Sequence, residues 1–178
     1  MKGKITMTAL NPSRAIGILV LRVAVGWVFL YAGFEKLLGA EPFSAAGFLQ
    51  FGTAGTAAGM AEGAIVNPTQ PFWVALASNA VLMDVVNFLV PFGQVAIGAA
   101  LILGLATRFA GAMGFLMMAF ITVAAWDFAY GVLNYTSLLA LTSLILGVIA
   151  AGEVYGLDAV IDETPVVRRT PSLRYLLA

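Results

Sequence analysis

The chain has 178 residues, of which 61% are hydrophobic and 10% charged, and its mean hydropathy is +0.98. This composition excludes an ordinary soluble globular domain and is typical of an integral membrane protein. Nine basic and nine acidic residues balance to a net charge of zero, and they form no basic patch sized for nucleic acid.

Cysteine and histidine are both absent from the sequence. Disulfides, thiolate-bound iron–sulfur clusters and thiolate zinc sites are therefore excluded from this chain. Histidine-ligated haem and a histidine proton relay are excluded as well. We predict no metal site, and any redox role would need a cofactor or a partner held by other groups.

The first predicted membrane span covers residues 15–38, an apolar segment that Arg22 interrupts near its start. Twenty apolar residues at a rise of about 1.5 Å each cross the roughly 30 Å hydrocarbon layer of a bilayer. Asn11 or Ser13 is placed to cap this helix, with Pro12 in its first turn. Arg22 would cost at least about 2.5 kcal/mol if left unpaired in the membrane. The sequence leaves two arrangements open: a buried, paired Arg22, or one that snorkels to the headgroups.

A long connection over residues 38–71 follows, rich in Gly, Ala and Thr, and we place it outside the membrane. It carries no basic residue and only two acidic ones, Glu41 and Glu62. A short interfacial helix is predicted around residues 43–51. Connections of this length usually carry function or cover a surface.

Three further spans are predicted, and the first of them has an outer extension that begins at Phe72. They cover residues 80–105, 109–127 and 134–151. Thr107 and Arg108 form a very short turn, which sets the helices on either side of it antiparallel. Asn134 is a good N-cap for the last span, and Gly152 is placed to end it.

The predicted fold class is therefore an all-α integral membrane four-helix bundle, antiparallel, with the long external connection between helices 1 and 2. Residues 1–158 form a single four-span membrane domain, and residues 159–178 form a tail. Apart from Arg22, almost all basic residues fall on the side of the termini, and Lys36 alone falls on the other side. Those on the terminal side are Lys2, Lys4, Arg14, Arg108, Arg168, Arg169 and Arg174. The positive-inside rule then predicts a multi-pass protein of the plasma membrane with both termini, and the tail, in the cytoplasm.

The most informative polar pattern lies on the second predicted span. The residues Asp84, Asn87, Pro91, Gln94 and Gly98 recur three or four positions apart, which aligns them on one helix face. Polar groups in lipid need partners, so this face should point into the bundle. Two interpretations stay open. Either Asn87 and Gln94 bond across helices, or the face lines an outward pocket with Asp84 at its mouth and Gln94 at its floor.

The first span also has two distinguishable faces. Tyr31 and Glu35 share one face, and they would orient a ligand carbonyl or hydroxyl if that face turns inward. Gly26 and Gly33 lie on roughly the opposite face, where they would let a neighbouring backbone approach closely. We favour a packing role for these two glycines over a binding role.

Two stretches resemble the signatures of the DoxX/DoxD family of membrane proteins. In LRVAVGWVFLYAGFEKLLG the family positions are met by Arg22, Gly26, Phe29, Gly33 and Lys36, and in GQVAIGAALILGLATRFAG by Gly93, Gly98, Gly104, Thr107 and Arg108. A closing pattern is met by Gly152, Gly156, Leu157 and Asp158. Many members carry Glu where this chain has Gln94, so a proton-transfer role of that carboxylate is not carried over. The long outer segment is similar to that of the DoxD-like small membrane subunit of thiosulfate:quinone oxidoreductase.

The resemblance implies a membrane subunit that works with a partner protein and with quinone. One function is an integral membrane subunit that anchors or assembles a larger respiratory or redox complex, in contact with lipid and with other redox subunits. The alternative is an oxidoreductase subunit that uses quinone as acceptor. Its quinone headgroup would then be bound by some of Tyr31, Glu35, Asp84 and Gln94, near the outer ends of the first two spans. The oligomeric state is left open, a homo-oligomer included.

Overall fold

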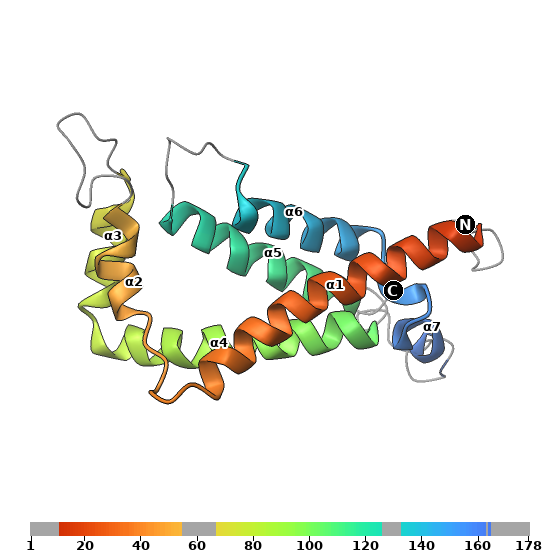
Figure 1. The fold of residues 1–178 in the computed structure, drawn as a ribbon, viewed down its shortest axis with the longest axis horizontal. Helices are drawn as coiled ribbons and strands as arrows, with labels where there is room; N and C mark the ends of the chain where they lie inside the picture. The colour runs from red at the N-terminus through yellow and green to blue at the C-terminus, as the bar shows by residue number, and fades with distance from the viewer. Residues whose placement is uncertain (1–10, 55–66, 126–132, 163, 165–178) are drawn as a thin grey trace.

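The structure is a computed structural model that describes residues 11–54, 67–125, 133–162 and 164, and every regular element in these ranges is a helix (Figure 1). Three of these helices are long and apolar enough to cross a membrane: α1 (Pro12–Leu37), α4 (Ala80–Leu103) and α5 (Thr107–Ala124). The apolar helix α6 (Tyr135–Val148) is shorter, at 14 residues. The prediction of an all-helical chain with long apolar helices is therefore confirmed.

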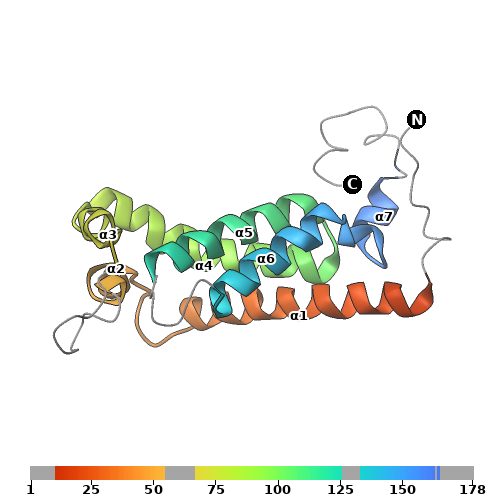
Figure 2. The ribbon, with the colours of Figure 1, turned by 90° about the horizontal axis from the view of Figure 1, so that it is seen from above.

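Short elements fill the connections between the long helices. They are α2 (Ala46–Gln50), η2 (Gly52–Ala54), α3 (Gln70–Ala77), η3 (Ala151–Glu153) and α7 (Leu157–Ile161). The helix α2 forms inside the 43–51 segment where a short helix is predicted. Seen from above, α1 runs along one side of the other long helices, with α2 and α3 at one end of the molecule and α7 at the other (Figure 2).

Two predicted helix caps are confirmed. The side chain of Asn11 accepts a hydrogen bond from the backbone N–H of Ser13 at 3.2 Å, and Pro12 occupies the first helical position of α1. Asn134 and Ser137 form a reciprocal capping box at the start of α6. Each cap satisfies a backbone donor that the first helical turn would otherwise leave without a partner.

The prediction of one continuous helix from Phe72 is wrong, because the chain breaks between α3 and α4. Asn79 adopts an extended conformation, with φ −95° and ψ 108°, and its side chain accepts a bond from the Leu82 N–H at 3.1 Å. The residue therefore acts as the N-cap of a new helix. The break lets α3 leave the line of α4 at a steep angle (Figure 1).

The predicted turn at Thr107 and Arg108 lies three residues too late. Helix α4 ends at Leu103, where Gly104 takes a left-handed conformation with φ 65°, and Ala106 takes another with φ 47°. Thr107 and Arg108 are the first residues of α5.

The last predicted span is also too long, since α6 ends at Val148 and not near Gly152. Ala150 has φ 49°, a left-handed conformation that turns the chain out of the helix. The predicted end of the third span, at residues 126–127, lies outside the described residues, as do Lys2, Lys4 and the three arginines of the tail.

Glycines bring α1 against α4. A Cβ on Gly98 of α4 would lie 2.5 Å from the Leu30 nitrogen of α1, and one on Gly33 would lie 2.8 Å from the Val95 nitrogen. A Cβ on Gly26 of α1 would lie 2.9 Å from the Gly98 carbonyl oxygen of α4. Real Cβ atoms do not tolerate such distances, so the predicted packing role of Gly26 and Gly33 is confirmed.

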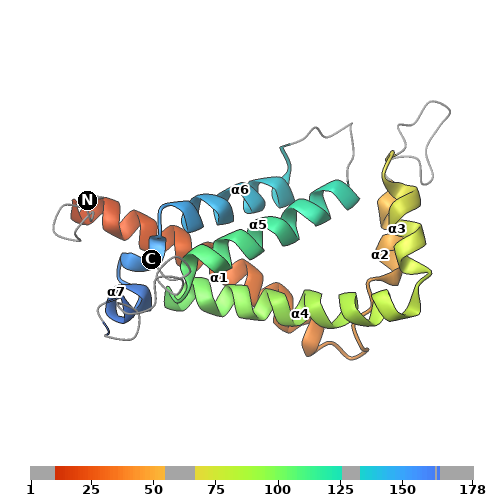
Figure 3. The same ribbon diagram turned by 180° about the vertical axis from the view of Figure 1, so that it is seen from behind.

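The long helices pack as two close pairs, α1 with α4 and α5 with α6. Helix α4 ends and helix α5 begins at the turn over residues 104–106. Along their length, these two helices contact each other much less than the members of either close pair do. They diverge from that turn, and α2 and α3 stand side by side across the open end (Figure 3).

Candidate functional site

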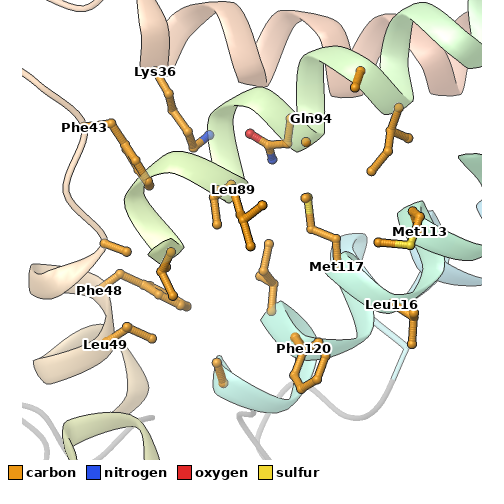
Figure 4. A pocket seen from close by; sticks show the side chains of 18 of the residues that line it. Lys36, Phe43, Phe48, Leu49, Leu89, Gln94, Met113, Leu116, Met117 and Phe120 are labelled. Atoms are coloured by element: carbon orange, nitrogen blue, oxygen red, sulfur yellow. The ribbon is translucent and has the colours of Figure 1, made fainter. Parts of the chain in front are cut away.

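A groove with a volume of about 940 Å³ lies between the diverging helices α4 and α5 and reaches α2 and α3 at its wide end (Figure 4). We call it the lateral groove. Its wall is formed mainly by aliphatic, aromatic and methionine side chains, including Phe43, Phe48, Leu89, Val90, Met113, Leu116, Met117, Phe120 and Ile121. This size and lining are typical of sites for small apolar molecules.

The wide end of the lateral groove is closed by hydrogen bonds from the segment around the start of α3 to the end of α5. The Asn67 Nδ2 atom donates to the Ala124 carbonyl at 2.7 Å, and the Thr69 Oγ1 atom donates to the Val123 carbonyl at 3.2 Å. The last carbonyls of a helix lack partners within the helix, so these bonds satisfy them. Trp73 Nε1 in turn donates to Thr69 Oγ1 at 2.8 Å.

Two further contacts hold this wall in place. The Trp73 ring, 6% exposed, meets the Phe120 ring of α5 edge-on, with 6.5 Å between the ring centroids. The Asn87 Oδ1 atom of α4 accepts a bond from the Ala45 N–H at the start of α2, at 2.9 Å. The described part of the long connection therefore forms one wall of the groove.

The floor of the lateral groove carries the side chain of Gln94 from α4. Gln94 is 4% exposed, and its Oε1 atom has no hydrogen-bond partner among the described residues. A buried acceptor without a partner costs about 1–3 kcal/mol, so its presence calls for a ligand or a functional explanation.

Lys36 of α1 points toward Gln94 from the neighbouring wall (Figure 4). Its Nζ atom donates to the Ala32 carbonyl at 3.0 Å and lies 5.7 Å from the centroid of the Phe43 ring. An ammonium group has three donors, so two are left for a ligand. In the described part of the groove wall, the polar side chains are Lys36, Gln94 and Ser44, apart from Trp73, whose nitrogen is already bonded.

The structure places one of the four predicted site residues in the groove. Gln94 lines it, whereas Tyr31, Glu35 and Asp84 do not. Tyr31 is 60% exposed, and Glu35 and Asp84 are exposed as well. Lys36 is the polar residue of α1 that faces the groove. The sequence connects it only with the membrane topology and the family signature.

The two interpretations of the polar stripe on α4 each describe part of it. Asn87 bonds to the Ala45 backbone, as the structural interpretation expects. Gln94 leaves its Oε1 atom free toward a cavity, as the pocket interpretation expects. Met113 and Met117 of α5 belong to the apolar lining, and their spacing of four residues is the signal from which this wall could have been found.

A second polar centre lies near the middle of α1, around Arg22. Arg22 is 1% exposed, and its guanidinium donates to the carbonyls of Ala151 at 2.7 Å, Val154 at 3.0 Å and Tyr155 at 3.2 Å. Of the two arrangements left open for this residue, the buried and paired one is observed. Tyr155 adopts a left-handed conformation with φ 51°, which presents its carbonyl to Arg22.

Asp158 completes this centre, which we call the Arg22–Asp158 junction. Its carboxylate accepts bonds from the N–H groups of Ala106 at 2.7 Å and Thr107 at 2.9 Å, at the start of α5. Its own N–H donates to the Gly104 carbonyl at 2.8 Å. The closing segment thus caps the α4–α5 turn. All these partners are backbone groups of the chain itself, so the junction is a structural feature and not a candidate active site.

In the described part of the chain, no group of three acidic side chains is placed to hold a metal ion. The family model described as DoxX matches residues 17–127, which include most of α1, the α4–α5 turn and all the described residues that line the lateral groove. Neither the comparison with curated proteins nor that with solved structures finds a match. The family match spans more than half of the sequence, and the chain belongs to the DoxX family of membrane proteins.

Proposed function

We propose that the chain is a membrane subunit of a redox complex and that its lateral groove binds a quinone. The observation that carries this proposal is an apolar groove of about 940 Å³ in which the buried Gln94 Oε1 atom lacks a partner. The apolar walls suit an isoprenoid tail, and the polar end suits the headgroup.

The chemistry of Gln94 and Lys36 fits both redox forms of such a carrier. A quinone carbonyl only accepts hydrogen bonds, and it would accept them from Lys36 Nζ and Gln94 Nε2. A quinol hydroxyl also donates, and Gln94 Oε1 would accept that bond. An amide side chain offers a donor and an acceptor together, so it needs no change of protonation to serve both.

The electrons would come from another component of the complex. The sequence has no cysteine and no histidine, so it offers neither a thiol couple nor the usual ligands of haem, iron–sulfur and zinc centres. A quinone site without an electron source of its own belongs to a subunit that works beside a redox partner.

We place α6 as the fourth span of an antiparallel bundle, with both termini in the cytoplasm. The 14 residues of α6 reach roughly 21 Å at about 1.5 Å each, so the adjoining segments would have to complete the crossing. Arg22 then lies toward the cytoplasmic side and Lys36 toward the outer side. The quinone head would meet water at the outer face of the membrane.

A second function, a subunit that anchors or assembles a complex without binding quinone, is favoured by apolar side chains outside the groove. Trp27 on α1 is 60% exposed, and Ile145 and Val148 on α6 are 53% and 72% exposed. These side chains offer surface to lipid or to neighbouring subunits. Exposed apolar area of this kind would serve either function.

The test is solvent extraction and mass spectrometry of the protein purified gently from its native membrane, with all co-purifying chains identified. We expect about one quinone per chain in the wild type and in the Asp84→Asn and Tyr31→Phe variants, whose side chains lie outside the groove. Gln94→Leu should lose most of the quinone. A wild type without quinone that reproducibly retains a redox protein would favour the anchoring function instead.

A further inference from the structure

The ammonium group of Lys36 is a positive charge at the end of an otherwise apolar groove, and its hydrogen-bond and ring contacts are with neutral groups. They are the Ala32 carbonyl at 3.0 Å and the face of the Phe43 ring, whose centroid is 5.7 Å away. A charge in apolar surroundings is costly unless it is paired. Among the described residues that line the groove, none is acidic.

The acidic residues around Lys36 do not pair with it. Glu35, the next residue on α1, interacts with Lys36 electrostatically, but its side chain is exposed. Glu41, which follows α1, and Asp84, on the packed helix α4, are exposed too. No carboxylate of the described residues lies within ion-pair distance of Lys36. The charge therefore stays available to a ligand inside the groove.

Gln94 is aimed at the same space. Its Oε1 atom is buried and has no partner, so no hydrogen bond joins it to Lys36 across the gap between them. An oxygen atom of a ligand placed in that gap would accept from Lys36 Nζ. The Gln94 amide would meet it with its N–H₂ group, or with Oε1 where the oxygen carries a proton.

We infer that Lys36 and Gln94 form a binding site for an ionised oxygen of a lipid-soluble phenol-like acid. This inference rests on the proposed function, and for a quinone carrier the acid is the singly deprotonated quinol. A neutral quinone would leave the charge of Lys36 uncompensated, whereas the quinol anion would pair with it. When the quinol binds, one O–H bond breaks, the proton passes to water at the mouth of the groove, and the anion stays with Lys36.

The experiment uses a nitrophenol with a dodecyl chain, because its phenolate form absorbs visible light. The apparent pKa of this probe is titrated in detergent micelles with and without the purified protein. An opposite charge within about 4–6 Å typically lowers the pKa of an acid by about 1–3 units. We expect a shift of that size for the probe bound to the wild type and to the Asp84→Asn control.

Variants at Lys36 then assign the shift. Lys36→Met should bind the probe without the shift, and Lys36→Arg should restore much of it. A shift of equal size in Lys36→Met would overturn the inference. The wild-type titration decides by itself if Lys36→Met does not fold.

The outcomes also separate this inference from the proposed function. A wild type that retains quinone but binds the probe with an unshifted pKa would overturn the anion site and leave the quinone proposal standing. A wild type that binds neither the probe nor quinone would overturn both.

Discussion

Helix α1 carries two basic side chains that the fold treats in opposite ways. Near the middle of the helix, Arg22 is 1% exposed and donates to three backbone carbonyls, so its terminal nitrogens are satisfied by the fold. Near the C-terminal end, Lys36 uses one donor on its own helix and faces a groove. The comparison separates a buried charge that holds the fold together from one that is left for a ligand.

The packing of the helices explains the difference. The α4–α5 turn and the chain after α6 converge at the Arg22–Asp158 junction. Their backbone groups bond the terminal nitrogens of Arg22 and both carboxylate oxygens of Asp158, while the Arg22 Nε atom has no partner among the described residues. Toward Lys36, α4 and α5 have diverged, and among the described residues α2 and α3 stand across the opening (Figure 3). In that part of the chain Lys36 bonds one backbone carbonyl, and the space between the helices is the lateral groove.

The largest effect is expected for Arg22→Met, which would break the junction. The carbonyls of Ala151, Val154 and Tyr155 would lose their donor, and each buried polar group left without a partner costs about 1–3 kcal/mol. We expect a loss of stability on the order of 3 kcal/mol or more, measured as a large fall in the melting temperature of the detergent-solubilised protein. Arg14→Met, at an exposed position of α1, is the control. Equal melting of the two variants would show that the junction does not stabilise the fold.

Gly98→Ala should have the next largest effect, because it forces α1 away from α4. The new Cβ would lie 2.5 Å from the Leu30 nitrogen, a backbone atom that cannot rotate aside. Overpacking of this kind typically costs about 1–3 kcal/mol. Gly17→Ala on α1 is the matched control, since a Cβ there meets nothing within 4 Å. If both variants melt at the wild-type temperature, the close contact of the two helices does not exist in the membrane protein.

Trp73→Phe tests the wall at the groove end and should cost less. The phenyl ring keeps most of the edge contact with Phe120 but loses the bond from Trp73 Nε1 to Thr69 Oγ1. A neutral hydrogen bond contributes about 1 kcal/mol, which is the loss of stability that we expect in thermal melting. Phe51→Leu is the control, because Phe51 is 71% exposed and is not among the residues that line the groove. A variant that retains quinone and stability like the control would show that this bond does not hold the wall.

Much of the fold follows from local sequence patterns. Hydropathy indicates the long helices, and the caps at Asn11 and Asn134 depend on neighbouring residues, so both were predictable. The turn over residues 104–106 was not, because Asp158 stabilises it from more than fifty positions away in the chain. The Ala106 conformation, with φ 47°, would be unusual without that support.

The site was predictable only in part, for a related reason. Helical periodicity placed Gln94 on the inward face of α4, and the structure agrees. On α1 the same reasoning chose Tyr31 and Glu35, whereas Lys36 faces the groove. Adjacent helix positions differ by about 100° in direction, and periodicity shows which residues share a face but not which face meets a neighbour.

Gln94→Leu should have the smallest effect on stability, and its sign should be opposite to that of Arg22→Met. The Oε1 atom of Gln94 has no partner, so the empty protein already bears the cost of burying it. Leucine fills a similar volume without a polar atom, and replacing a buried unpaired polar group by an apolar one is nearly neutral or stabilising, by up to about 1 kcal/mol. We therefore expect the quinone-free variant to melt at or slightly above the wild-type temperature, while its quinone content falls.

These two variants together test the comparison between the Arg22–Asp158 junction and the lateral groove most directly. Replacing a residue that stabilises the fold by an apolar residue lowers the stability of the protein. Replacing a residue that binds a ligand lowers only the binding of that ligand. The melting temperatures of Gln94→Leu and Arg22→Met are best measured on protein stripped of quinone, because a bound ligand would itself stabilise the wild type. If Gln94→Leu destabilises the stripped protein as strongly as Arg22→Met does, Gln94 belongs to the framework of the fold. The lateral groove would then have no polar floor set aside for a ligand.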